Sequence, residues 1–573
     1  MHPTLVGLLG SLAVGILLGA GGAHLSEEIE VQVRSQPMPS GEEITAELRE
    51  RVQAGRASGR VSVAGVSLHS TESLPRFYED RLFEPAWVGP QGLSEAGERL
   101  LGVLDTARAD GLRMGDYHRE VLDSLWTPGM GSPASAPTTA AEWAELELLL
   151  SDAFLLLALH RHQGKVDPET RRTQWTVSRP ENQDMVTLLQ EVMEGQEVES
   201  ALESLGPQHP GYEAMGAALV ELRAVAAEGG WGEVPSGGRL EEGSQGPRMT
   251  ALRQRLQASG DLVALTPQEP ELFDDELDEA VRAFQRRHGL DVDGVVGPQT
   301  LAALNVSVED RIRQLEVNLE RWRWLPQELG ADHVLVNIAD FRVDVVADHR
   351  RVMRLGAVVG RAYRQTPVMS DSITYLVLAP YWHVPPGIAV NDQLPQLRAD
   401  PQGHLAAHNM TLLEQGTSRP VDPAVVDWAS ITGAEFNRRY RIRQEPGPWN
   451  ALGQVKFMFP NRFNVYLHDT PAQDLFQRTA RDFSSGCVRV ERSLELAEHL
   501  LRDDPAWDGE RIRRAAAGGV ERTARLPAPV PVHLQYWTAW VDEEGVLHFR
   551  RDIYNRDGRV LTALNAPPPH ASP

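Results

Sequence analysis

The residues with the clearest chemical potential are Cys487 and His468. Cys487 is the only cysteine among the 573 residues. A thiol becomes a strong nucleophile when it is ionised, and a neighbouring imidazole can take its proton. His468 ends an apolar run at 464–467, whereas Cys487 follows a Ser-Ser-Gly turn and precedes a second apolar run at 488–490. Two neighbouring strands of this kind can bring both side chains to one end of a sheet, which predicts a cysteine nucleophile with a histidine base.

The turn before the thiol adds a second chemical feature. Gly486 allows the backbone to bend tightly, and the N–H groups of Gly486 and Cys487 can then face a developing oxyanion. Spacing alone leaves another interpretation open, because a lone cysteine is often a small buried hydrophobe and a lone histidine often has only structural hydrogen bonds.

The same residues carry a family resemblance. His-Asp-Thr-Pro at 468–471, followed by Ser-Ser-Gly-Cys-Val-Arg-Val at 484–490, resembles the signature of the L,D-transpeptidase catalytic domain (YkuD-like). The similarity is to the large multidomain subgroup typified by YcbB. Many family members carry a histidine directly before the Gly-Cys pair, whereas this chain has Ser485 there. The resemblance therefore implies that His468 is the general base and acid.

The resemblance also implies roles for residues around the pair. In relatives a backbone carbonyl just after the histidine often orients the ring, which points to the main-chain oxygen of Asp469, with its carboxylate as an alternative. Tyr466 lies on the same strand face and either donates its hydroxyl to the oxyanion or serves in packing. Arg489 either holds a substrate carboxylate with its planar donor fork or pairs with an acid and braces the loop. Further candidates for substrate binding are Ser485, Tyr381, Trp382 and Asn450.

Composition limits the partners and cofactors. The formal net charge of −24 argues against nucleic acid or anionic lipid as a general partner, since both are polyanions. A single cysteine permits no intramolecular disulfide. No spacing of histidine, cysteine and acidic residues predicts a metal site, so we expect neither a metal nor another cofactor.

The N-terminus predicts export. An apolar run spans 5–20, small residues follow at 21–23, and charge begins at Glu27. This pattern is typical of a signal peptide with cleavage after Ala23, although no Lys or Arg precedes Arg34 and the run is also close to the length of a membrane anchor. We therefore expect residues 1–25 to be a signal peptide or an inner-membrane anchor, and the protein to act in the periplasm or cell envelope.

The chain divides into segments of different pattern, and we expect a multidomain α+β fold. Helical periodicity at 143–159, a Gly-rich boundary at 229–246 and alternating strands from 334 onward set the main divisions. A resemblance to three-helix peptidoglycan-binding modules rests on Ala-Phe-Gln at 283–285 and on the turn residues of 293–301. The expected segments are a linker at 26–72 with some helix at 42–52, a helical scaffold domain at 73–245, a peptidoglycan-binding module at 246–306, a linking helix at 307–330, a mostly β YkuD-like catalytic domain at 331–550 with a capping insertion at 381–454, and a C-terminal tail at 551–573 that is disordered from Ala566.

The resemblance implies the reaction. Family members cut the bond between the third, diamino residue of a peptidoglycan stem tetrapeptide and its terminal D-Ala, and pass the acyl group to another stem as a 3→3 cross-link. Carbapenems acylate the same thiol in relatives, which makes them expected inhibitors. An L,D-carboxypeptidase and a non-catalytic wall-binding scaffold remain alternatives. A papain-like peptidase is disfavoured, because its cysteine would lie far upstream of its histidine.

Overall fold

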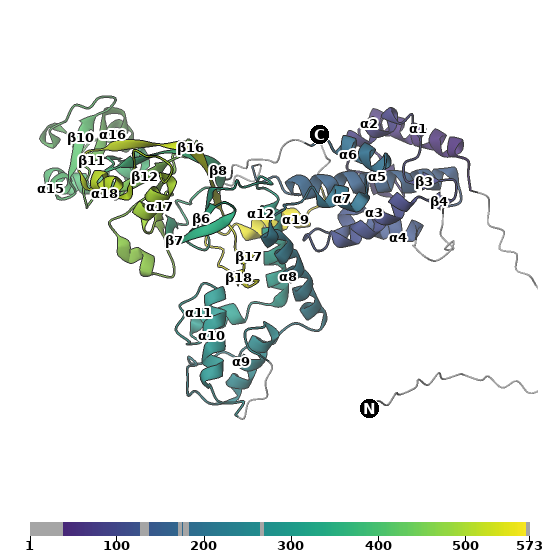
Figure 1. Cartoon of the computed structure of the whole chain (residues 1–573), viewed down its shortest axis with the longest axis horizontal. Coiled ribbons are helices and arrows are strands. Elements are labelled where there is room, and N and C mark those ends of the chain that lie inside the picture. The colour runs from purple at the N-terminus through teal and green to yellow at the C-terminus, as the bar shows by residue number, and fades with distance from the viewer. Residues whose placement is uncertain (1–37, 127–136, 170–174, 176–182, 264–268, 569–573) are drawn as a thin grey trace, which may run out of the picture.

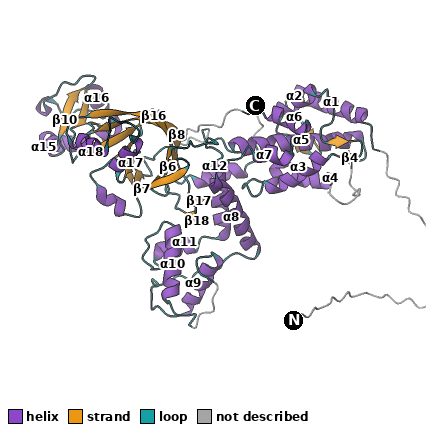
Figure 2. Ribbon diagram, in the orientation of Figure 1, coloured by secondary structure: helices purple, strands orange, loops and turns teal. Residues whose placement is uncertain are grey.

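The computed structural model describes residues 38–126, 137–169, 175, 183–263 and 269–568. Figure 1 shows a helical domain, a small helical module and a β-rich domain that meet around helices α8 and α12. Figure 2 shows that strands gather almost wholly in the β-rich domain. The expected signal peptide or anchor lies outside the described residues, and within them no helix combines the length and apolar character that a membrane crossing requires.

The N-terminal domain is built around one long buried helix, α5 (Ala140–Gln163). A capping box formed by Thr139 and Glu142 starts this helix, and buried side chains lie on all its faces, as expected for a helix at the centre of a core. The helices around it are α1 (Gly41–Ser58), α2 (Ser73–Asp80), α3 (Glu95–Thr106), α4 (Arg119–Leu125), α6 (Met185–Met193) and α7 (Val198–Glu203), with the short strand pairs β1–β2 (Ser62–Val63, Val66–Ser67) and β3–β4 (Val88–Gly89, Gly92–Leu93).

Helix α1 corrects the predicted linker at 26–72. It begins with its own capping box at Ser40 and Glu43 and buries Ile44, Leu48 and Val52 in the same core as α5. The sequence predicted a helix here, but the low apolar content of the segment hid that its few apolar side chains share one face. The described part of this segment therefore belongs to the helical domain.

A buried acid lies in the core of this domain. The Glu147 carboxylate accepts hydrogen bonds from the N–H groups of Ala86 and Trp87 and from the Tyr78 hydroxyl. Burial outweighs these bonds and raises the pKa of Glu147 to about 7. The domain therefore contains a carboxyl group that titrates near neutral pH.

The small helical module contains α9 (Pro247–Ala258), α10 (Asp275–Arg287) and α11 (Pro298–Leu304). Leu252, Leu256, Leu277 and Phe284 form much of its separate core. The expected linking helix follows as α12 (Val308–Trp322), which packs with α8 (Pro210–Ala227) and the hairpin β17–β18 (Ala539–Val541, Leu547–Phe549) in one apolar cluster. This cluster joins α8 and α12 to the β-rich domain.

The β-rich domain is a sheet that closes on itself. Its strands are β5 (His333–Asn337), β6 (Arg342–Ala347), β7 (Arg350–Gly360), β8 (Met369–Leu378), β12 (Val455–Met458), β13 (Leu467–His468), β14 (Asp482–Ser484), β15 (Val488–Val490) and β16 (Arg522–Gln535). Their order is β14-β7-β15-β13-β12-β8-β16-β5-β6, and β6 also pairs with β7. Helices α17 (Ser493–Leu500) and α18 (Gly509–Ala517) contribute to the same core.

The predicted insertion at 381–454 is a subdomain with a core of its own. It leaves after β8 and returns at β12, and these strands are neighbours with Leu378 opposite Val455. The subdomain contains the sheet β10-β11-β9 (Met410–Glu414, Tyr440–Gln444, Trp382–His383), helices α13 (Pro386–Ile388), α14 (Leu394–Ala399), α15 (Pro401–Ala407) and α16 (Gly433–Arg439), and the π-helix η2 (Ala389–Gln393). We name residues 381–454 the cap.

The C-terminal segment corrects the predicted tail at 551–573. Helix α19 (Asp557–Asn565) buries Val560 and Leu564 in the core of the β-rich domain. The main-chain oxygen of Leu564 also accepts a hydrogen bond of 2.7 Å from the buried Lys165 ammonium of the helical domain. The high polar content of the segment hid this role, because most of its contacts are to residues far away in the sequence.

Candidate active site

Cys487 and His468 lie on one face of two paired strands. In the parallel pair β13–β15, Leu467 is opposite Val488 and His468 is opposite Arg489. Because side chains alternate along a strand, Leu467 and Val488 point into the core, and His468 and Arg489 share the other face. Two residues before His468 and Arg489, Tyr466 and Cys487 come to that same face. The predicted nucleophile is therefore diagonal to the predicted base.

The imidazole of His468 is fixed by its neighbours. Its Nδ1–H donates a hydrogen bond of 2.5 Å to the main-chain oxygen of Asp469, the contact expected from the sequence. The Asp469 carboxylate instead accepts from the Gln454 N–H and from the Gln473 amide. With Nδ1 engaged as a donor, Nε2 of a neutral ring keeps its lone pair and can accept a proton.

The thiol and the imidazole are both neutral at rest. Burial lowers the pKa of His468 to about 3, and the positive charge of Arg489 acts in the same direction. Burial raises the pKa of the half-buried Cys487 thiol to about 11. The Tyr466 main-chain N–H, the charge of Arg489 and the Tyr466 hydroxyl oppose the rise, in that order. The described residues contain no hydrogen bond between His468 and Cys487. The site therefore contains a base ready to accept a proton and not a preformed thiolate–imidazolium pair.

The turn before the thiol has one free donor and not two. The Gly486 N–H donates a hydrogen bond of 3.1 Å to the Ser484 hydroxyl, which itself donates to the main-chain oxygen of Cys487. Gly486 is therefore wrong as a predicted oxyanion donor, because the tight turn folds its N–H back onto Ser484. Within the described ranges, the Cys487 N–H donates to no protein acceptor, so it remains available for an oxyanion.

Positive charge without a protein counter-ion surrounds the pair. Arg489, Arg361 and Lys456 form no ion pair among the residues that the structure describes, and Nε of Arg489 is buried without a hydrogen-bond partner. Lys456 is opposite His468 on β12, and the charge of Arg361 acts on Arg489. Burial lowers the pKa of both Arg489 and Lys456. A ligand carboxylate would satisfy this local excess of positive charge.

Three protein-family models match stretches of this chain. Residues 331–508 match the family model described as the L,D-transpeptidase catalytic domain. Residues 72–219 match a scaffold domain, and residues 245–304 match a model named "Putative peptidoglycan binding domain". The chain carries an L,D-transpeptidase domain. It also carries a scaffold domain and a peptidoglycan-binding domain. The large helical domain of the fold corresponds to the scaffold domain, the small helical module to the peptidoglycan-binding domain, and the β-rich domain to the transpeptidase domain.

A relative and two solved structures add to this comparison. The "Putative L,D-transpeptidase" of Haemophilus influenzae is 35% identical over 258 residues, which cover 45% of this chain and 51% of that protein. The chain thus matches about half the length of this relative. A crystal structure of an L,D-transpeptidase fragment from Xylanimonas cellulosilytica is 19% identical, with a TM-score of 0.18, 53% of this chain covered and 100% of that chain. A fused amidase/peptidase with a peptidoglycan-binding domain from Clostridium acetobutylicum is 12% identical, with a TM-score of 0.14 and coverages of 52% and 100%.

The turn before Cys487 is tied to the cap through Arg364. Arg364 donates hydrogen bonds of 2.6 and 3.0 Å to the two carboxylate oxygens of Asp392, which lies in η2 of the cap. The same guanidinium donates a bond of 2.9 Å to the hydroxyl of Ser485. The predicted Ser485 therefore contacts the link between the cap and the turn.

Three other predicted binding residues lie in or beside the cap. Asn450 is fully buried, and its amide bonds to the main-chain oxygens of Pro380 and Glu445 and to the Leu452 N–H. Its prediction as a binding residue is wrong, because the turn at the return of the cap uses both ends of the amide.

The two aromatic candidates are also engaged by the protein. Trp382 packs against the core of the cap. The Tyr381 ring lies 4.4 Å from the guanidinium of Arg443. The structure therefore gives both rings packing contacts within the cap.

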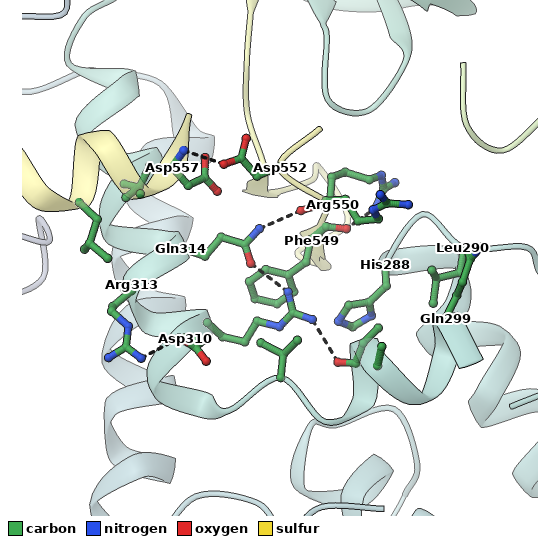
Figure 3. A pocket seen from close by; sticks show the side chains of 18 of the residues that line it. His288, Leu290, Gln299, Asp310, Arg313, Gln314, Phe549, Arg550, Asp552 and Asp557 are labelled. Atoms are coloured by element: carbon green, nitrogen blue, oxygen red, sulfur yellow. Dashed lines mark hydrogen bonds and ion pairs between the residues drawn. The ribbon is translucent and has the colours of Figure 1, made fainter. Parts of the chain in front are cut away.

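A large cavity lies elsewhere in the molecule. Its volume is about 630 Å³, and it is lined by residues of the peptidoglycan-binding domain, α12 and the C-terminal segment. Figure 3 shows His288 and Gln299 on one side of it, Gln314 on another, and Phe549 between them. Its lining includes none of the predicted site residues, so the size of a cavity does not locate the chemistry here.

Several residues around the site escaped the sequence analysis. Arg361, Arg364 and Thr366 lie in the segment that follows β7. Lys456 could have been found from strand alternation, since it lies opposite His468. Nothing in the local sequence marks the C-terminal residues described below.

Proposed function

We propose that this protein is a peptidoglycan L,D-transpeptidase that forms 3→3 cross-links between stem peptides. The observation that carries the proposal is the placement of Cys487 and His468 on one face of β13–β15, with the Nδ1–H of His468 bonded to Asp469. The free Cys487 N–H and the unpaired charge of Arg489 support it. The expected substrate supplies both a carbonyl for the thiol and carboxylates for the cations.

The proposed reaction is an acyl transfer in two halves. Nε2 of His468 takes the thiol proton as Sγ of Cys487 bonds to the carbonyl carbon of the third stem residue. The Cys487 N–H stabilises the oxyanion, and the bond to the nitrogen of D-Ala breaks after that nitrogen receives the proton from His468. The side-chain amine of a second stem then attacks the thioester, loses its proton to His468 and releases the thiol.

The neutral resting pair affects how the first half proceeds. A thiol pKa of about 11 and an imidazole pKa of about 3 make an ion pair in the free enzyme strongly unfavourable. Proton transfer must therefore accompany the attack or follow substrate binding. A negatively charged substrate beside Arg489 and Lys456 would also offset the charges that lower the pKa of His468.

The location and the wall contacts follow from the same proposal. The domain types imply that the protein interacts with peptidoglycan in the cell envelope, and we propose the periplasm, with the 1–25 segment as signal peptide or anchor. Residues 246–306 would hold the enzyme on the wall. Carbapenems are the expected inhibitors, because they would acylate Cys487.

The test uses purified tetrapeptide muropeptides and mass spectrometry. The wild-type protein should produce 3→3 dimers and free D-Ala, and Cys487→Ala should produce neither. Equal turnover by the variant would remove Cys487 as the nucleophile. Tripeptide without dimers would identify an L,D-carboxypeptidase, which shares the same thioester and differs only in the acceptor. Retention on sacculi with neither product would identify a non-catalytic scaffold.

A further inference from the structure

A buried hydroxyl holds the peptide group next to the nucleophile. The Thr366 hydroxyl donates a hydrogen bond of 2.9 Å to the main-chain oxygen of Gly486 and accepts one of 2.9 Å from the Gly360 N–H. Thr366 is fully buried, so water does not compete for these bonds. The Gly486 carbonyl oxygen therefore has one fixed direction.

Fixing this oxygen also fixes the amide N–H of Cys487. The Gly486 oxygen and the Cys487 nitrogen belong to one planar trans peptide unit, in which C=O and N–H point in opposite directions. The Thr366 contact on one side therefore directs the Cys487 N–H to the other side. This N–H is the donor left free at the turn, so Thr366 preorganises the place where an oxyanion would form.

The loop that carries Thr366 is held by the C-terminal segment. The Tyr554 hydroxyl donates a hydrogen bond of 2.5 Å to the main-chain oxygen of Gly360 and accepts one of 3.3 Å from the Thr366 N–H. The Arg556 guanidinium donates to the Gln365 amide oxygen at 2.9 Å and to the main-chain oxygen of Thr366 at 3.2 Å. A Cβ atom at Gly360 would lie 2.1 Å from the main-chain oxygen of Arg364, so this close packing requires glycine.

Arg556 itself is fixed by aromatic rings and not by an acid. Its guanidinium lies 4.8 Å from the centre of the Tyr554 ring, 5.0 Å from Tyr536 and 5.5 Å from Trp175 of the scaffold region. It forms no ion pair within the described residues, and burial lowers its pKa to about 10. Rings stabilise a buried guanidinium through their faces and leave its N–H groups free to reach the loop.

We propose that Thr366, Tyr554 and Arg556 are positioning residues that orient the Cys487 N–H for the oxyanion. The inference deepens the proposed function and depends on it. It makes the segment after β18 part of the active-site support, although 188 residues of sequence separate Tyr554 from Thr366. It also places a scaffold-region ring, Trp175, against the residue that holds the loop.

The test compares two reactions of the same thiol in the full-length protein. Acylation by a carbapenem passes through an oxyanion, whereas alkylation by iodoacetamide does not. Loss of an oxyanion donor costs about 10²–10³-fold in rate, and loss of its orientation alone should cost about 10–10²-fold. Thr366→Val, which keeps the shape of the side chain, should slow acylation by that factor and leave alkylation within about twofold.

Two further variants separate orientation from general damage. Thr366→Ser retains the hydroxyl and should restore acylation to within about fivefold of the wild type. Tyr554→Phe removes the hydroxyl's bond to Gly360 and the bond that the hydroxyl accepts from the Thr366 N–H. It should slow acylation about three- to tenfold, again without a change in alkylation. Intact mass spectrometry follows both reactions, and circular dichroism checks that each variant is folded.

The outcomes distinguish this inference from the proposed function. If the wild type is neither acylated nor active on tetrapeptides, the proposed function fails. If the wild type is acylated and Thr366→Val matches it, the positioning role is refuted. Equal slowing of acylation and alkylation, or no recovery in Thr366→Ser, would also refute it, because the substitution would then act on the thiol or on the fold.

Discussion

The neutral state of the thiol can be tested through the pH dependence of its alkylation. Burial raises the pKa of Cys487 to about 11, with a hydrogen bond from Tyr466 acting in the opposite direction. Only the thiolate reacts with iodoacetamide. The reaction rate of the free enzyme should therefore keep rising with pH well beyond the range in which an ordinary cysteine is fully ionised.

The expected rate can be calculated from this pKa. At about pH 7.5, roughly a tenth of an ordinary thiol with a pKa of about 8.5 is ionised. A thiol with a pKa of about 11 is ionised to roughly three parts in 10⁴. The more basic thiolate is about tenfold more nucleophilic, which recovers part of this difference. Alkylation of Cys487 should thus be roughly 30-fold slower than that of a small thiol in the same solution.

The assay follows the intact mass of the protein from about pH 6 to pH 10.5, with glutathione as the reference thiol. Tyr466→Phe is the matched variant, because it removes the hydroxyl that favours the thiolate and keeps the ring. It should shift the profile to higher pH. A wild-type rate that reaches its plateau below about pH 8 would refute the reasoning, since it would require a thiolate already paired with a protonated His468.

Three further predictions concern the base, the cap and the helical domain. His468→Ala should slow carbapenem acylation about 10²–10⁴-fold, as loss of a general base does; an unchanged rate by intact mass would mean that another group takes the proton. Arg364→Ala removes the link from Asp392 to the turn before Cys487, so amide hydrogen exchange in 389–399 should accelerate severalfold. The free energy of unfolding should change by less than about 1 kcal/mol, because the Arg364–Asp392 pair is partly exposed. Unchanged exchange protection would show that the cap is held by other contacts. Since the pKa of Glu147 is raised to about 7 in the folded state, the native protein binds a proton that the unfolded chain has lost, and its stability falls as pH rises from about 4.5 to about 7. The unfolding free energy of the wild type relative to Glu147→Gln, from urea titrations, should therefore fall by roughly 3 kcal/mol over that window; a constant difference would contradict the shift.

The sequence predicted the parts of the site that depend on neighbouring residues. The runs at 464–467 and 488–490 predicted two strands that could bring His468 and Cys487 to one end of a sheet. The observed register of β13 and β15 then placed both side chains on one face. The bond from His468 to the main-chain oxygen of Asp469 joins adjacent residues and was equally accessible. The two helical regions and the β-rich region were also predicted, from the periodicity of apolar residues and from local motifs.

Other predictions failed where the outcome depended on packing. Asn450 has the side chain of a binding residue, but its burial against the main chain of 380 and 445 cannot be inferred from its neighbours. The turn at Gly486 was predicted, but the direction of its N–H depends on the Ser484 rotamer. Helices α1 and α19 fall in segments that were predicted as a linker and a tail. Their few apolar side chains are buried against cores formed by distant residues, which the local sequence does not show.

The sequence by itself determined which atoms can react, because a thiol, an imidazole and their strand pattern are local properties of the chain. The tertiary structure alone decided their protonation and the direction of the oxyanion donor. Burial sets the pKa values of Cys487 and His468, and Thr366, Tyr554 and Arg556 come together only when the C-terminal segment packs beside the loop after β7. Desolvation and long-range hydrogen bonds are produced by folding, so no short stretch of sequence contains them.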